Sequence, residues 1–353
     1  MTTTTIEKTA QAGAGDNPRV DAYAGPLWKG YRKLYGDAKF SYKDYFGAID
    51  VIAALQLMPD EIPWLTIVPR HPEPKDTVLF LGCNALRTPN LVLATVDVLK
   101  ALDIDFVTIG GPANCCSIVQ SLHGDMHMAE KVSETSSDKI SRYNPNNVVT
   151  ICPNCNYTYE HVVSKTQDPP FEMVQFYEFL HGRIQDAPFE KPFEKRIGLH
   201  RHLGSSHHQD RHGEMCADIL AAIPGVEVVE LPSFEDLGPL CTHPASTDMT
   251  EERHDEIMDA LFSAAAAEKC DMMAVIYHSC QRELGAQEHR APVEVKSVYE
   301  IVAEAFGYHH EDKLKRFRKI GDVDAILKEV APNMEAHRIS PDAARAALAP
   351  LVG

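Results

Sequence analysis

Three short apolar runs that end in or just before cysteine decide the fold of this chain. Residues 78–83 read VLFLGC, residues 106–116 read FVTIGGPANCC and residues 148–155 read VVTICPNC. Each run is β-branched or aromatic and short enough to be a buried strand. Helical patterns lie between the runs, at Leu91–Leu102 and Ile118–Tyr143. Strands and helices that alternate in this way predict a parallel sheet.

Five of the nine cysteines follow the predicted strands: Cys83, Cys115, Cys116, Cys152 and Cys155. The carboxyl ends of parallel strands share one edge of an open α/β sheet, and ligands bind at that edge. We therefore expect the five thiols to converge there. Gly110 and Gly111 precede the Cys-Cys pair, and glycine lets a backbone turn sharply and approach a cofactor closely. The pattern predicts a metal centre.

The second half of the chain repeats the first. Its expected strands are Ile197–Leu199, Val226–Leu231 and Met272–Tyr277, and its expected helices are Asp210–Ile223 and Glu251–Lys269. A constant offset of 125 residues relates Cys116 to Cys241 and Cys155 to Cys280. Such self-similarity indicates an internal duplication. We predict an α/β protein with two tandem Rossmann-like parallel-sheet cysteine-rich units.

These patterns divide the chain into five parts. Residues 1–20 are expected to be a disordered tail, because they are rich in Thr, Ala and Gly and lack the apolar segment of a signal peptide. Residues 21–76 are an aromatic N-terminal extension with a helix near Tyr45–Met58, expected to pack on its own chain rather than on a partner. The first cysteine-rich domain takes residues 77–190, the second 191–310, and a helical C-terminus 311–353.

Composition excludes some classes of function. The chain has 34 basic and 51 acidic residues and a net charge of −17, which argues against non-specific nucleic-acid binding. No apolar run reaches the roughly 18 residues of a transmembrane helix. We expect a cytoplasmic protein with no membrane span. In a reducing compartment, nine cysteines indicate metal or redox chemistry rather than a disulfide framework.

The order of Cys, then Cys-Cys, then Cys-x-x-Cys resembles the cysteine-rich CCG domain of the heterodisulfide reductase B-subunit family. That family includes the heterodisulfide-reductase-like complexes of sulfur oxidation, and its hallmark is two such domains in tandem. The resemblance covers Thr77–Leu284. It implies a non-cubane [4Fe-4S] cluster with Cys83, Cys115, Cys116, Cys152 and Cys155 as ligands. Five sulfurs suit an iron–sulfur cluster, whereas a tetrahedral zinc uses four ligands.

The second half departs from this family pattern. Residues 239–243 read PLCTH in place of the Cys-Cys pair, and residues 277–280 read YHSC in place of Cys-x-x-Cys. The first cysteine is absent, and histidines crowd its region: His200, His202, His207 and His208. Three alternatives stay open. The second site binds nothing, holds a modified cluster, or binds a second metal such as zinc through a mixed set drawn from His202, Cys241, His243, His278 and Cys280.

The resemblance also implies a function. A disulfide or persulfide substrate, carried on another protein in the sulfur-oxidation type, approaches Cys83, Cys115 and Cys116, which are then the catalytic cysteines. The chain has no ferredoxin run of cysteines and no dinucleotide-binding glycine motif after a strand. Two partner subunits are therefore implied, a ferredoxin-like iron–sulfur subunit and a flavoprotein. Two alternatives remain: a non-catalytic electron-transfer subunit, and a zinc-binding structural protein.

Overall fold

The structure is a computed structural model that describes residues 41–201, 207–234, 237, 241 and 249–352. The expected tail at residues 1–20 and residues 21–40 of the aromatic extension lie outside this part of the chain. None of the helices in the described ranges is long and apolar enough to cross a membrane.

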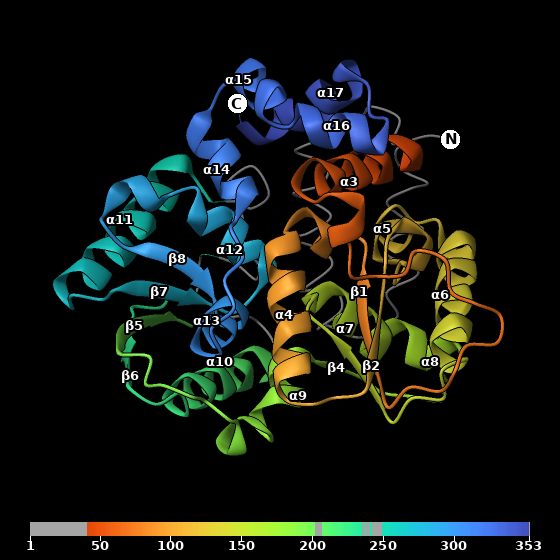
Figure 1. The fold of residues 1–353 in the computed structure, drawn as a ribbon, viewed down its shortest axis with the longest axis horizontal. Coiled ribbons are helices and arrows are strands. Elements are labelled where there is room, and N and C mark those ends of the chain that lie inside the picture. The colour runs from red at the N-terminus through yellow and green to blue at the C-terminus, as the bar shows by residue number, and fades with distance from the viewer. Residues whose placement is uncertain (1–40, 202–206, 235–236, 238–240, 242–248, 353) are drawn as a thin grey trace.

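Two parallel sheets of four strands form the framework (Figure 1). The first sheet contains β1 (Thr77–Gly82), β2 (Phe106–Gly110), β3 (Asn147–Thr150) and β4 (Met173–Gln175), and the second contains β5 (Lys195–His200), β6 (Val226–Glu230), β7 (Met272–Val275) and β8 (Glu294–Ser297). The strand orders are β2-β1-β3-β4 and β6-β5-β7-β8. The first strand of each unit, β1 or β5, therefore lies between the second and the third strand of that unit, and the fourth strand lies at the edge. The prediction of two Rossmann-like α/β units is confirmed.

Helices follow the strands in each unit. The first unit, β1 to α9, contains η2 (Asn84–Arg87), α4 (Pro89–Ala101), η3 (Pro112–Asn114), α5 (Ile118–Leu122), α6 (Met126–Ser141), α7 (Pro153–Thr158), η4 (Tyr159–Val163), α8 (Ser164–Thr166) and α9 (Phe176–His181), and is followed by η5 (Ile184–Asp186). The second unit, β5 to α13, contains α10 (His207–Ala221), α11 (Glu251–Ala267), α12 (His278–Gly285), η8 (Glu288–Arg290) and α13 (Val298–Ala305).

The central strands explain the apolar runs in the sequence. All six residues of β1 and all four of β7 are buried, because helices cover both faces of a parallel sheet. The edge strand β6 has no fully buried residue: its valines are half-buried and its glutamates are exposed. One continuous apolar core spans both units. Helix α4 of the first unit packs against α13 of the second, where Asn90 Nδ2 donates to Glu300 Oε1 at 2.7 Å.

Helices from the two ends of the described chain pack together at one end of the molecule (Figure 1). They are α3 (Tyr42–Gln56), η1 (Pro59–Glu61), α14 (Lys313–Ile320), α15 (Val323–Glu329), α16 (Ala331–His337) and α17 (Pro341–Val352). Ile52 and Leu55 of α3 share an apolar cluster with Phe317 and Leu348. The side chain of Gln56 donates to the carbonyl of Arg87 at 3.0 Å, which ties this helical layer to the turn after Cys83.

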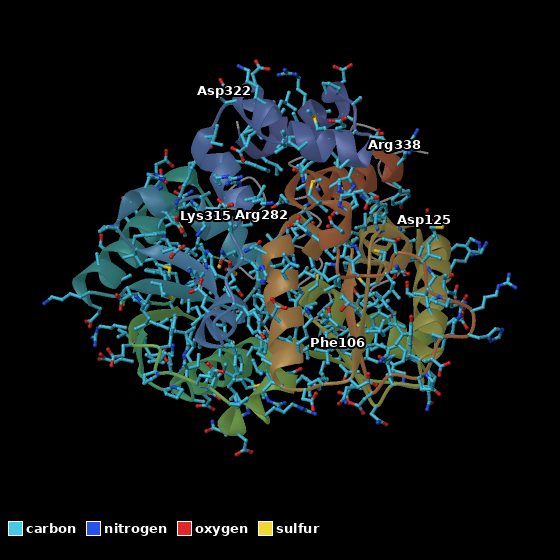
Figure 2. All side chains as sticks on the ribbon, viewed as in Figure 1. Phe106, Asp125, Arg282, Lys315, Asp322 and Arg338 are labelled. Atoms are coloured by element: carbon cyan, nitrogen blue, oxygen red, sulfur yellow. The ribbon has the colours of Figure 1, made fainter. Side chains whose placement is uncertain are left out.

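Charged side chains of helix α14 form hydrogen bonds with the second unit. Lys315 Nζ lies 2.7 Å from Glu288 Oε1 and 3.0 Å from the carbonyl oxygen of Val295. Arg318 donates to the carbonyl of Arg282. Figure 2 labels Lys315 and Arg282 where α14 meets α12. The C-terminal helices thus contact both units, through α3 on one side and through α14 on the other.

The helix expected over Ile118–Tyr143 is two helices. Helix α5 ends at Leu122, and α6 begins at Met126. Gly124 between them has a φ of +72°, a conformation that ends helices and favours glycine. The side chain of Asp125 then accepts from the Met128 amide at 3.2 Å and caps the new helix. The apolar periodicity continues across this break, which is why the sequence pattern did not reveal it.

Two edge strands differ from expectation. Strand β4 spans Met173–Gln175, where the sequence analysis names no strand, and α9 begins directly after it at Phe176. Strand β8 begins at Glu294, near the end of the second unit, where no strand was named either. Strands of three or four residues are too short to establish a period of two. Their positions follow from pairing with β3 and β7.

Candidate functional site

The five cysteines meet at the carboxyl edge of the first sheet. All are buried, with exposed fractions of at most 4%. Cys83 Sγ lies 3.8 Å from Cys115 Sγ. Cys116 is within hydrogen-bonding reach of both Cys115 and Cys155, and Cys155 is within reach of Cys152. The thiols therefore form one continuous series, from Cys83 through the vicinal pair to Cys155 and Cys152, which we call the cysteine row.

Two glycines allow the backbone to pass beside the cysteine row. Gly82 has a φ of +61°, and a β-carbon placed there would lie 2.6 Å from Cys155 Sγ. Gly111 has a φ of +103°, and its amide donates to the Gly82 carbonyl at 2.8 Å. These contacts join the ends of β1 and β2. The sequence analysis named Gly111 but not Gly82. The position of Gly82 directly before Cys83 could have indicated its role.

The turn after the vicinal pair points backbone amides at the sulfurs. Ser117 has a φ of +78°, which is uncommon for a residue other than glycine. Its amide lies 3.4 Å from Cys115 Sγ, and the amide of Ile118 hydrogen-bonds Cys116. Helix α6 holds this turn, because Ser136 Oγ donates to the carbonyl of Cys115 at 2.9 Å. Amide donors of this kind stabilise negative charge on sulfur.

The Cys-x-x-Cys segment occupies the start of α7. Cys152 directly precedes the helix, and its amide donates to Thr150 Oγ1 at 3.1 Å. Pro153 takes the first helical position, where its missing N–H costs nothing. The amide of Cys155 bonds the Cys152 carbonyl at 3.1 Å, so one helical turn brings the two sulfurs together. The ring of Tyr159 packs edge to face on Phe80, with ring centroids 5.9 Å apart.

The direction of the pKa shift alternates along the cysteine row from Cys115 to Cys152. Hydrogen bonds from Cys115 and Cys155 hold the pKa of Cys116 well below its usual range. A hydrogen bond from Cys155, helped by His278, lowers the pKa of Cys152 to about 5 against the opposing effect of burial. The same bonds raise the pKa values of Cys115 and Cys155. Buried thiolates without a cationic partner are costly, so this donor set fits a bound metal group.

The five thiols outnumber the four ligands that a single tetrahedral zinc ion uses. Among the described residues, no three or more His, Cys, Asp or Glu side chains are placed to hold one metal ion. Thiolate is the usual ligand of iron–sulfur clusters. The donor chemistry therefore fits the cluster that the sequence pattern implied.

The second unit brings a smaller set together. Cys241 and Cys280 are buried and adjacent, and burial followed by the bond with Cys280 raises the pKa of Cys241. His200 Nε2 lies 3.3 Å from Cys241 Sγ. His200 ends β5, the strand that corresponds to β1, and the proposed mixed ligand set did not include it. His278 lies beside Cys152 of the first unit.

The remaining candidates of the second site lie outside the described residues. They are His202 and His243, together with the side chains of His207 and His208. The three alternatives for this half of the protein stay open.

Comparisons with known proteins gave a family match and two similar proteins. Residues 77–159 match the CCG family, described as a cysteine-rich domain. The chain is 26% identical over 278 residues to the D subunit of dihydromethanophenazine:CoB–CoM heterodisulfide reductase from Methanosarcina acetivorans, an alignment that covers 70% of this chain and 63% of that protein. The chain thus spans less than two thirds of that relative's length.

A solved structure of a hypothetical protein from Helicobacter pylori aligns with 85% of this chain and 60% of its own, with a TM-score of 0.46 and 10% identity. The cysteine-rich match falls on the residues that carry the cysteine row, β1 to the start of η4. Residues 77–159 of this chain thus match the cysteine-rich CCG family, and the chain as a whole is similar to a subunit of a heterodisulfide reductase.

Proposed function

We propose that this protein is the iron–sulfur subunit of a heterodisulfide reductase-like complex and that it cleaves or forms a disulfide or persulfide bond. The observation that carries the proposal is the row of five buried cysteines within the segment that matches the cysteine-rich family. The similarity to one of the subunits of a heterodisulfide reductase supports the same assignment. The number of cysteines, their burial and the match to the cysteine-rich family all support the proposal.

Five residues would hold the cofactor, a non-cubane [4Fe-4S] cluster: Cys83, Cys115, Cys116, Cys152 and Cys155. When bound, such a group supplies one-electron transfer beside a sulfur atom of the substrate. The chain's own contribution is to exclude water by burial and to stabilise the sulfurs with the amides of Ser117 and Ile118. We propose that the substrate approaches the cluster beside Cys83, Cys115 and Cys116, which are then the catalytic cysteines.

The reaction requires partners. Cleavage of R–S–S–R′ takes up two electrons and two protons and yields two thiols, and formation of the bond releases them. The electrons have to come from or go to another electron carrier. We propose a ferredoxin-like iron–sulfur subunit and a flavoprotein subunit of the same complex as these carriers, with a thiol, disulfide or persulfide substrate that can be bound to a carrier protein.

One observation favours a second candidate function. The five cysteines are at most 4% exposed, and so deeply buried a redox group also suits an electron-transfer subunit that touches no substrate. The two functions differ in one measurable way. An enzyme subunit reduced with dithionite releases thiols from a disulfide such as cystamine, whereas an electron-transfer subunit is reoxidised only by its protein partner.

The first test measures metal content. The protein is purified without oxygen, and iron, acid-labile sulfide and zinc are measured per chain for the wild type, Cys83→Ala and the control Cys270→Ala. We expect about four irons with matching sulfide, lost in Cys83→Ala and kept in Cys270→Ala, because Cys270 lies outside the cysteine row. About eight irons would assign a modified cluster to the second unit. Zinc without iron would contradict the proposal and favour a structural zinc protein.

A further inference from the structure

A lysine side chain lies against the turn that carries the vicinal cysteines. Lys139 belongs to α6, which runs along the outer side of the first unit (Figure 1). Its Nζ donates to the carbonyl of Ala113 at 2.7 Å and to Asn114 Oδ1 at 2.9 Å. Cys115 follows these two residues directly. The ammonium group is therefore held by the two residues next to the first vicinal cysteine.

Among the residues that the structure describes, no carboxylate forms an ion pair with Lys139. Its neighbours on α6, Asp138 and Arg142, pair with each other at 2.5 Å, so their charges offset one another. Burial lowers the pKa of Lys139 from its usual 10.5, but the side chain is only half-buried and keeps its proton at neutral pH. Because both acceptors of Lys139 are neutral oxygens, one uncompensated positive charge remains beside the turn.

The side chain of Asn114 fixes the position of this charge. Asn114 is fully buried, and its Nδ2 donates to the carbonyls of Gly110 at 2.8 Å and of Thr66 at 3.1 Å. An amide nitrogen only donates, so these two bonds leave Oδ1 as the acceptor for Lys139. The amide cannot turn over without losing both bonds. Asn114 therefore ties the end of β2 and the segment beside it to α6, and the fold sets where the ammonium group lies.

The same face of α6 also holds the cysteine. Ser136 lies about one helical turn before Lys139, and its Oγ donates to the carbonyl of Cys115 at 2.9 Å. The sulfur of Cys115 has other neighbours: it lies 3.4 Å from the Ser117 amide and 3.8 Å from Cys83 Sγ. Lys139 contacts the turn through carbonyl and amide oxygens rather than through a sulfur. It can therefore act on the site by its charge, but not as a ligand.

We propose that the positive charge of Lys139 raises the reduction potential of the iron–sulfur group held by the cysteine row. The inference rests on the proposed function and deepens it. Each electron that arrives from the partner iron–sulfur subunit makes the group more negative by one charge. A fixed cation nearby stabilises the added negative charge, and only the screening by water limits the effect. Lys139 thereby helps to set the direction in which electrons flow between the partner and the disulfide.

The test is a redox titration at pH 7 of the full-length protein purified without oxygen, followed by electron paramagnetic resonance. We expect Lys139→Met to make reduction less favourable by about tenfold, which for one electron is a shift of about 59 mV towards negative potentials. Lys139→Arg keeps the charge and the donors, so its potential should match that of the wild type. Lys131→Met, at an exposed position of the same helix, is the matched control and should leave the potential unchanged.

Salt separates an effect of charge from an effect of structure. The difference between the wild type and Lys139→Met should shrink when the salt concentration rises from 0.1 M to 1 M, because the screening length falls from about 10 Å to about 3 Å. A lysine that only supports the turn predicts no such dependence. Equal potentials, or a shift that salt leaves unchanged, would overturn the inference.

A second variant covers the case in which Lys139→Met retains no iron. Lys139→Gln keeps a hydrogen-bond donor and loses the charge, and it then replaces Lys139→Met in the titration. Loss of iron in all three variants at Lys139, with an equal loss of stability of the metal-free chain in urea, would assign the lysine to folding alone and overturn the inference.

The inference and the proposed function fail in different ways. Equal potentials in a protein that releases thiols from cystamine contradict the role of Lys139 alone. A protein that holds iron but releases no thiols contradicts the disulfide chemistry, while the titration still tests the charge. A wild type without iron overturns both.

Discussion

At residue 82 the backbone passes so close to Cys155 that a side chain does not fit. The overlap of a β-carbon with Cys155 Sγ at 2.6 Å adds to the strain of a left-handed conformation at φ +61°. Two neighbouring cysteines of the row, Cys83 and Cys115, depend on the same turn, because Gly111 bonds the Gly82 carbonyl. The spacing of the cysteines is therefore only part of the site. The glycine before the first cysteine is equally required.

Gly82→Ala is expected to destabilise the protein by roughly 2–4 kcal/mol, from the left-handed conformation and the steric overlap together. Iron content per chain should fall with it, since Cys155 has to move. Gly182→Ala is the matched control: its β-carbon meets nothing within 4 Å, and its φ of −74° suits any residue. Urea unfolding and iron analysis measure both variants. Equal stabilities would show that the turn at Gly82 tolerates a side chain.

Helix α6 stabilises the turn that carries the vicinal cysteines. Helix α6 contacts the Cys115 turn from outside, through Ser136 and through Lys139, which donates to the carbonyl of Ala113 at 2.7 Å. This helix exists as a separate element because Gly124 follows the end of α5 with a positive φ and Asp125 caps α6. Of the buried serines of α6, Ser136 contacts this turn.

Asp125→Ala is expected to cost about 1 kcal/mol, because the Met128 amide loses its capping acceptor. The comparison is Asp138→Ala in the same helix, which removes only an exposed pair with Arg142 and should cost no more than about 0.5 kcal/mol. Chemical denaturation of both variants gives the two free energies of unfolding. A larger loss in Asp138→Ala than in Asp125→Ala would contradict the assigned cap.

At the scale of the whole molecule, the two units share one apolar core and are joined by α4 and α13. We propose residues 77–190 and 191–310 as the two cysteine-rich domains and residues 311–353 as a C-terminal helical region. The described part of the N-terminal extension, α3, packs on α16 and α17. Because the core is continuous, we expect the two domains to unfold together rather than separately.

Glu300 makes the contact between units dependent on pH. Its carboxyl group accepts from Asn90 at 2.7 Å and from the Ser297 amide at 3.0 Å. Burial, and then Asp312, raise its pKa from 4.5 to about 8. The folded protein therefore keeps a proton here that the unfolded chain loses. The stabilisation is complete below about pH 4.5 and is lost as pH rises towards 8.

Glu300→Gln removes this titration and keeps the size of the side chain. Between pH 5 and pH 8 the stability of the wild type should fall relative to the variant by on the order of 1.4 kcal/mol per pH unit. The substitution Glu335→Gln, at an exposed position, should show no such trend. Urea unfolding at several pH values measures the difference. Parallel pH profiles for Glu300→Gln and the wild type would contradict a protonated carboxyl at this contact.

Much of the architecture could be predicted from local pattern. The apolar runs before Cys83, Cys115 and Cys152 predicted parallel strands, and the offset between Cys155 and Cys280 predicted two units of the same order. These predictions succeed because a strand buried on both faces needs a continuous apolar run, whatever packs around it. The shared sheet edge for the five cysteines followed from the same reasoning.

Contacts between the units were decided only by the tertiary structure. The pairing of His200 with Cys241, and the network of Glu178, His212 and Tyr277, join residues far apart in the sequence. No periodicity marks them, because they depend on how the helices of one unit meet the strand ends of the other. The sequence alone therefore determined the strands and the convergence of the five cysteines. Packing of the two units decided which polar side chains face those cysteines, because only a folded core brings distant side chains together.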